Sequence, residues 1–261
     1  MTERIETNKI IKVVKLVAQI ILENGGETYR AEDTVIRICQ SYGFTEVNPI
    51  AIPTGLFITI SRDGIENHTI VKRVKNRTVD LSKVNAANNI SRLLTEKKLT
   101  LDEAIVELEK LAMTIPPNKY LLIIASALTA GFFALLFKGN FFDFCIAALC
   151  GAAIQLAVFV FKGEDMNQFM TSLVGGLVTA IIALSAVTLF NKGNVELIIG
   201  GAIMPLLPGL AMTNAIRDTM GGDLVSGVAR GAEAVFIATG LAVGVGVILK
   251  IFLLLGGGSI Q

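Results

Sequence analysis

The pattern of hydrophobic and polar positions divides the chain into two parts. Residues 120–255 contain five long apolar segments with few charges between them. Each segment is close to the roughly 20 residues that an α-helix needs to cross the hydrocarbon of a bilayer. The predicted spans are 120–137, 141–161, 169–190, 195–212 and 231–255. The sequence therefore predicts a domain of about five transmembrane helices over 119–261, preceded by a separate domain over 1–118.

The first 118 residues show the shorter patterns of a water-soluble domain. Residues 46–74 are rich in Ile, Val, Thr and Phe and are interrupted by Pro53-Thr54-Gly55 and Asp63-Gly64, which predicts strands joined by turns. Elsewhere apolar residues recur every three or four positions, which predicts helices. The expected strands are 47–52, 55–61 and 68–74, and the expected helices are 9–24, 28–42, 81–95 and 101–112. The predicted fold is α+β, with helices flanking a small antiparallel sheet.

Charge is distributed as unevenly as hydrophobicity. Residues 1–119 hold 17 of the 23 Lys and Arg and 15 of the 22 Asp and Glu. No cleavable signal pattern opens the chain, and the first apolar segment begins only near Tyr120. We therefore expect a multi-pass protein of the cell (inner or plasma) membrane with a cytoplasmic N-terminus. The net charge of +1 gives no electrostatic reason to expect nucleic acid as a partner.

The residues that most enzymes and metal sites require are scarce. His68 is the only histidine, and the three cysteines, Cys39, Cys145 and Cys150, form no CxxC pair. Zinc sites and His-based catalytic triads need more such ligands and bases than this. The sequence predicts neither a metal, nor a cofactor, nor an enzyme.

The richest polar chemistry of the membrane half lies in residues 204–234. Pro205 and Pro208-Gly209 interrupt the fourth apolar segment, and broken helices at membrane depth are tolerated where they line a cavity or are buried in protein. Two polar stripes with helical spacing follow this break. Their candidate substrate or coupling residues are Asn214, Arg217, Asp218, Asp223, Arg230 and Glu233.

Two interpretations of these stripes stay open. Ionisable residues in or beside a span are functional candidates by default, and an arginine suits a substrate carboxylate. Asp218, Asp223 or Glu233 would suit an ammonium group or a coupling proton. Alternatively, Arg217–Asp218 and Arg230–Glu233 are neutralising pairs that only stabilise a loop.

Four stretches of the sequence together resemble a known family. They are GGETYRAED at 25–33, IPTGLFITI at 52–60, TVDLSKVNAANNISRLLTEKKLTLDEAIVELEKL at 78–111 and PGLAMTNAIRDTMGGDLVSGVARGAEA at 208–234. The chain resembles the threonine/serine exporter (ThrE-like) family, within it the larger subunit of the split two-component type (YjjP-like). The resemblance adds Gly25, Glu27, Arg30 and Glu32 as second-rank candidates, for which helix capping and surface pairing are the simpler explanation.

The resemblance implies a subunit of a secondary exporter that moves threonine, serine or small dicarboxylates out of the cytoplasm. It also implies a small membrane protein as the partner subunit that completes the transporter, and a homo-oligomer is a further possibility. An odd number of spans agrees with this, because one half of an inverted-repeat transporter has such a count. The alternative is a membrane-anchored sensor or regulator whose cytoplasmic domain binds a ligand. The polar content of residues 214–233 argues against spans that only anchor.

Overall fold

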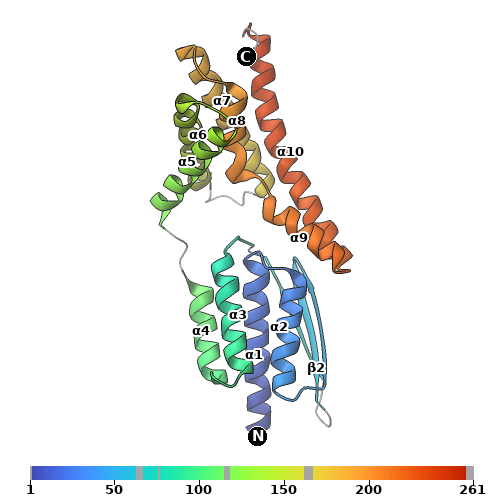
Figure 1. Cartoon of the computed structure of the whole chain (residues 1–261). Coiled ribbons are helices and arrows are strands. Elements are labelled where there is room, and N and C mark those ends of the chain that lie inside the picture. Colours follow the sequence, from blue (N-terminus) through green and yellow to red (C-terminus); the bar gives the residue numbers. More distant parts are fainter. Residues whose placement is uncertain (1, 63–66, 76, 115–117, 162–166, 257–261) are drawn as a thin grey trace. The chain divides into compact units, whose positions relative to one another are not determined.

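A computed structural model describes residues 2–62, 67–75, 77–114, 118–161 and 167–256 (Figure 1). The chain divides into two compact units. The N-terminal unit comprises Met1–Ile115 together with Leu210–Gly231, and the membrane unit comprises Pro116–Gly209 together with Ala232–Gln261. The segment Leu210–Gly231 therefore packs with the N-terminal residues, although the sequence assigns it to the membrane half.

Three antiparallel strands form the sheet of the N-terminal unit, in the order β1-β2-β3. They are β1 (Glu46–Ile52), β2 (Gly55–Ser61) and β3 (His68–Arg73), within a residue of the predicted bounds. Pro53 and Thr54 make the two-residue turn between β1 and β2, which pairs Ile52 with Gly55. Pro49 is tolerated because β1 is an edge strand, where a missing backbone donor costs little. The predicted Asp63-Gly64 turn lies outside the described residues.

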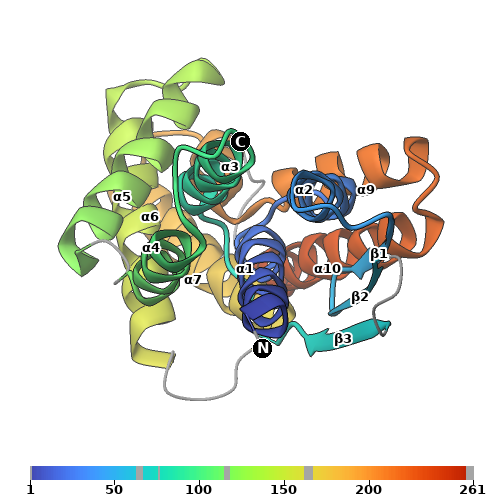
Figure 2. The same cartoon turned by 90° about the horizontal axis from the view of Figure 1, so that it is seen from below.

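Four helices complete this part of the unit, and the first two of them pack against the sheet (Figure 2). They are α1 (Thr2–Glu23), α2 (Thr28–Ser41), α3 (Leu81–Thr95) and α4 (Leu101–Met113). α1 packs against the other three helices, and its buried face supplies much of the core. It begins seven residues before the predicted start, because its polar first turns continue the helix and already place Thr7 on the buried side.

The core of this unit consists mainly of large aliphatic side chains. Ile10, Ile21, Ile38, Leu56 and Ile58 are fully buried. Each such side chain contributes roughly 1.5–3 kcal/mol when it leaves water, so this core is the main source of the unit's stability. Thr100 and Glu103 form the predicted capping box of α4.

The membrane unit contains α5 (Lys119–Leu136), α6 (Phe141–Phe161), α7 (Gln168–Phe190) and α8 (Val195–Ile203). α8 is only nine residues long and packs against α5, α6 and α7. A 3-10 turn over Met204–Leu206 ends it, Leu207 is extended, and α9 (Gly209–Met220) follows. The helix thus breaks at Pro205 and Pro208, since a proline has no backbone N–H to continue the helical ladder.

The last helix, α10 (Leu224–Leu254), has 31 residues. Its first residues, as far as Gly231, belong to the N-terminal unit. Among the described residues, α5, α6, α7 and α10 are long and apolar enough to cross a membrane, and α8 with α9 would make a fifth, broken span. The protein is therefore a helical membrane protein with four or five candidate spans and a small N-terminal sheet.

Candidate functional site

A loop of unusual backbone geometry joins α1 to α2 and forms one side of the site. Gly25 has φ of +86°, a conformation that favours glycine, and Gly26 donates its N–H to the Ile21 carbonyl at 2.8 Å. The carbonyl of Gly25 accepts a hydrogen bond from Asn214 Nδ2 at 2.9 Å, and that of Gly26 accepts one from Arg230 Nη2 at 2.8 Å. Two buried side chains from the 210–231 segment therefore bind the backbone of this loop.

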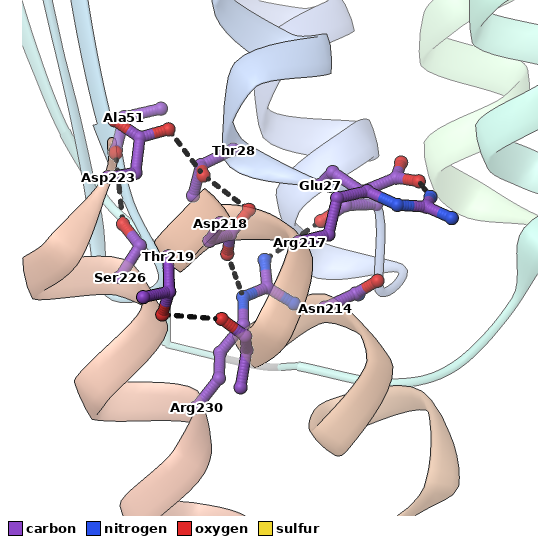
Figure 3. Close-up of polar contacts among 12 residues, drawn as sticks. Glu27, Thr28, Ala51, Asn214, Arg217, Asp218, Thr219, Asp223, Ser226 and Arg230 are labelled. Atoms are coloured by element: carbon purple, nitrogen blue, oxygen red, sulfur yellow. Dashed lines mark hydrogen bonds and ion pairs between the residues drawn. The ribbon is translucent and has the colours of Figure 1, made fainter. Parts of the chain in front are cut away.

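Asp218 lies at the centre of the site and is almost fully buried (Figure 3). Thr28 Oγ1, at the first residue of α2, donates to its Oδ1 at 2.9 Å. Arg230 Nε forms an ion pair with its Oδ2 at 3.0 Å, and both side chains are shielded from solvent. Removing one partner of such a pair leaves an uncompensated buried charge, which typically destabilises a protein by roughly 3–5 kcal/mol.

Two more carboxylates approach the same place. Asp223 Oδ2 lies 3.2 Å from the Thr28 hydroxyl, so Asp218 and Asp223 share one hydroxyl donor. Glu32 Oε1 accepts from the backbone N–H of Ala51 at 2.7 Å. Burial raises the pKa of Glu32; the Ala51 N–H opposes that shift, while the nearby charges of Asp223 and Asp218 add to it.

The outer side of the site is an ion-pair chain on α2 and α9. Glu27 binds both Arg217, by a close contact, and Arg30, whose Nε lies 2.8 Å from Glu27 Oε2. The Glu27 carboxylate is nearly buried, whereas the Arg217 side chain is 49% exposed. This pair is therefore open to solvent on the arginine side, unlike Asp218 and Arg230.

We call these residues the polar network. It consists of Glu27, Thr28, Arg30, Glu32, Asn214, Arg217, Asp218, Asp223, Ser226 and Arg230, with the carbonyls of Gly25, Gly26 and Ala51. Its four carboxylates face three guanidinium groups, so one negative charge is in excess when all are ionised. Among the described residues, no group of three or more His, Cys, Asp or Glu is placed to hold a metal ion.

The structure brings nine of the sequence candidates into this one network: five from residues 214–230, and Gly25, Glu27, Arg30 and Glu32. Of the expected pairs, Arg217–Asp218 is wrong. Arg217 instead binds Glu27, and Asp218 pairs with Arg230. Neighbours one position apart on a helix point about 100° apart, so Arg217 and Asp218 reach different partners.

Other candidates lie elsewhere in the chain. Glu233 belongs to the membrane unit, two residues beyond the end of the N-terminal unit. Pro205, Pro208 and Gly209 form the break between α8 and α9. Glu27 stands at the N-cap position of α2 but makes no side-chain cap, because its carboxylate binds the two arginines.

Sequence reasoning missed Thr28 and Ser226 as site residues. The sequence predicts Thr28 only as the start of a helix, and it does not single out Ser226 among the polar residues of 204–234. Thr28 is fully buried, and Ser226 Oγ lies 3.5 Å from the Ala51 carbonyl. The position of Thr28 directly after Gly25-Gly26-Glu27, within one of the recognised motifs, was the available signal.

Comparison with known proteins identifies the family of the chain. A family model described as "Putative threonine/serine exporter" (ThrE) matches residues 12–252. A Mycobacterium tuberculosis protein named "Probable threonine/serine exporter" is 22% identical over 250 residues, which cover 94% of this chain and 47% of that protein. The chain therefore spans about half the length of that relative.

A second relative is similar in length to this chain. It is a Klebsiella aerogenes protein named "Probable succinate transporter subunit YjjP", 22% identical over 255 residues, which cover 93% of this chain and 94% of that protein. No solved structure matches the chain. Because the family model covers nearly the whole sequence, the chain belongs to the threonine/serine exporter (ThrE) family.

Proposed function

We propose that this chain is one subunit of a secondary exporter that moves threonine, serine or small dicarboxylates out of the cytoplasm. Its family is one of transporters, which is not an enzyme class. The relatives' names supply the two substrate classes, hydroxy amino acids and succinate. In this proposal, residues 1–118 lie in the cytoplasm and the polar network is the substrate and coupling site.

The observation that carries the proposal is the location of the polar network in the chain. Asn214, Asp218 and Arg230 are buried polar side chains on a segment that continues directly into membrane helices at both of its ends. Buried charge is expensive and is kept where it has a function, above all beside membrane-spanning segments. A segment that only connected two spans would not need such a network.

The pair Glu27–Arg217, which is open to solvent on the arginine side, is the proposed point of substrate entry. A zwitterionic amino acid carries one carboxylate and one ammonium group, the same two charges as this pair. Its carboxylate can replace Glu27 on Arg217 by a bidentate contact, and its ammonium group can bind the released Glu27 carboxylate. The buried pair Asp218–Arg230 positions the site, because exchange of its partners would leave a buried charge unpaired.

The surplus negative charge of the network suits a cationic group. Four carboxylates around three guanidinium groups favour the binding of one proton or one ammonium group, and a proton bound here would couple transport to a proton gradient. In one part of the network two carboxylates, those of Asp218 and Asp223, accept hydrogen bonds from the same donor, the Thr28 hydroxyl. We propose that the coupling proton binds there.

A partner subunit is part of the proposal. One relative is named as a subunit, and another is about twice as long as the matched region. A small membrane protein would supply the second set of spans, as in transporters built from inverted repeats. The sensor alternative is not favoured, because family membership supports transport and a sensor needs no broken helix.

The test is efflux of labelled threonine, serine and succinate from vesicles. The chain is reconstituted alone and with the small membrane protein proposed as its partner subunit. We expect flux that depends on the partner and is lost in Arg217→Ala. The matched control is Arg37→Ala. Arg37 forms an exposed ion pair with Asp33, and both residues lie on α2. A stable complex without flux of any of the three compounds would contradict the proposal.

A further inference from the structure

The helical hairpin formed by α9 and the start of α10 has a second face, which is apolar and exposed. On α9 the exposed apolar side chains are four residues apart, and on α10 they fall within one and a half turns. They are Met212, Ile216, Met220, Leu224, Val225 and Val228. Met220 is 84% exposed and Val225 is 71% exposed. We call these six residues the apolar face of the hairpin.

The apolar face points away from the polar network. At 100° per residue, Met212 and Ile216 lie roughly opposite Asn214 and Asp218 on α9. Leu224 and Val228 lie opposite Ser226 and Arg230 on α10 by the same count. The two helices touch through Gly227, where an added Cβ would meet Thr219 Oγ1 and the Ala215 carbonyl. The hairpin is therefore amphipathic, and its polar side is the side that the N-terminal unit holds.

Covalent continuity places this hairpin next to the bilayer. It follows α8 directly after the break, and its second helix continues to Leu254. With 31 residues, α10 is about 46 Å long, whereas the hydrocarbon core of a bilayer is about 30 Å thick. Upright in the bilayer, α10 would exceed the hydrocarbon by about ten residues, and residues 224–231 are at the end that joins the hairpin.

The charges of the hairpin give no reason for electrostatic adsorption to anionic lipid. Residues 209–231 contain two arginines and two aspartates, which sum to zero. Asp218 and Arg230 are buried together, and Arg217 is paired with Glu27. Exposed aliphatic and methionine side chains next to a membrane are instead typical of helices that lie in the interface plane with the apolar face in the acyl-chain boundary.

We propose that the apolar face of the hairpin inserts into the lipid interface and anchors the N-terminal unit on the membrane surface. The polar network then binds one side of the hairpin while lipid covers the other. This proposal goes beyond transport and does not depend on which substrate is moved.

The test uses nitroxide labels on the full chain in lipid nanodiscs. Single cysteines are introduced as Ile216→Cys, Met220→Cys and Val228→Cys after Cys145→Ala removes the exposed native thiol; Cys39 and Cys150 are buried and remain. Asp102→Cys supplies an exposed site on α4 as the aqueous reference. Leu189→Cys supplies an exposed site on α7, which is 78% exposed, as the lipid reference.

The expected result is that all three hairpin labels collide with lipid-dissolved oxygen as the Leu189 label does. A water-soluble nickel chelate should relax them several-fold less than it relaxes the Asp102 label. The accessibility should be the same in neutral and in anionic lipid, because the attachment is apolar. Chelate access equal to that of the Asp102 label would overturn the proposal. Exclusion of both reagents would also overturn it, since protein would then cover this face.

Discussion

The interiors of the two units differ in the size of their buried side chains. The N-terminal unit fills its core with Ile, Leu and Val, whereas the buried positions of α5, α6 and α7 are mostly alanine and glycine. Water drives large apolar side chains together, but lipid tails are as apolar as leucine and give no such drive between helices. Membrane helices therefore pack by close backbone approach.

The contact of α7 with α10 illustrates this close approach. A Cβ added at Gly176 would lie 2.6 Å from the Leu241 carbonyl oxygen and 3.2 Å from the Gly244 Cα. The segment 210–231 follows neither pattern, since polar side chains hold it to the rest of the N-terminal unit. The comparison teaches that each part of the chain is stabilised by a different interaction, and each can be removed separately.

The largest expected effect is loss of the membrane unit in Gly176→Val. The valine side chain would collide with the backbone of α10, which cannot move aside as a flexible side chain can. We expect no monodisperse protein by size-exclusion chromatography in detergent. Gly246→Val on α10 is the matched control, because nothing lies within 4 Å of a Cβ added there. Equal yields of the two variants would contradict the close packing of α7 on α10.

The next effect is on the attachment of the 210–231 segment. Asp218→Ala leaves the Arg230 guanidinium buried without its ion pair, and we expect a loss of roughly 3–5 kcal/mol in the stability of the N-terminal unit. Limited proteolysis should cut the hairpin at far lower protease concentration. Asp33→Ala removes an exposed pair with Arg37 and should change stability by less than about 1 kcal/mol. If the two variants resist protease equally, Asp218 does not hold this segment.

The third prediction concerns the water-driven core. Ile58→Ala removes a fully buried side chain of β2 and should destabilise the unit by roughly 2–5 kcal/mol. Ile50→Ala on β1 removes the same side chain from a position that is 61% exposed, and should change stability by about 0.5 kcal/mol or less. Thermal unfolding of the detergent-solubilised chain measures both. A similar loss of stability in both variants would contradict this account, because Ile50 would then have to be buried as well.

The smallest effect is a pH dependence at Glu32. Burial and the charges of Asp223 and Asp218 raise its pKa, so the folded state binds this proton more tightly than the unfolded state. The stabilisation from this group is present below the unfolded pKa and is lost as pH rises through the raised pKa. Glu32→Gln should therefore gain stability over the parent as pH rises towards 7, with little difference near pH 4. Glu46→Gln, an exposed carboxylate of β1, is the control, and a constant difference across pH would contradict this account.

The N-terminal fold was largely predictable from local patterns. Strands β1 to β3 alternate more and less exposed side chains, and Thr100 with Glu103 marks the start of α4, so period and capping sufficed. Helical spacing also grouped Asn214 and Asp218 on one face of α9. The break at Pro205 and Pro208 followed from the missing backbone donors.

The partners of that face were not predictable. Glu27 and Arg217 are 190 residues apart, and no periodic pattern connects them. The start of α10 at Leu224, seven residues before the predicted span, extends into a polar stripe that hydropathy excludes from a membrane helix. Docking of this stripe on the N-terminal unit satisfies Ser226 and Arg230, so tertiary contacts overrode the local signal.

The central claim is that the pair Glu27–Arg217, which is open to solvent on the arginine side, binds substrate while the buried pair Asp218–Arg230 positions it. The most direct test compares threonine and succinate efflux in Glu27→Gln, with Arg37→Ala as control and folded protein measured in each sample. The account predicts at least a tenfold loss of threonine flux with succinate flux kept, because only threonine has an ammonium group for Glu27. Unchanged threonine flux in Glu27→Gln and in Arg217→Ala would contradict it.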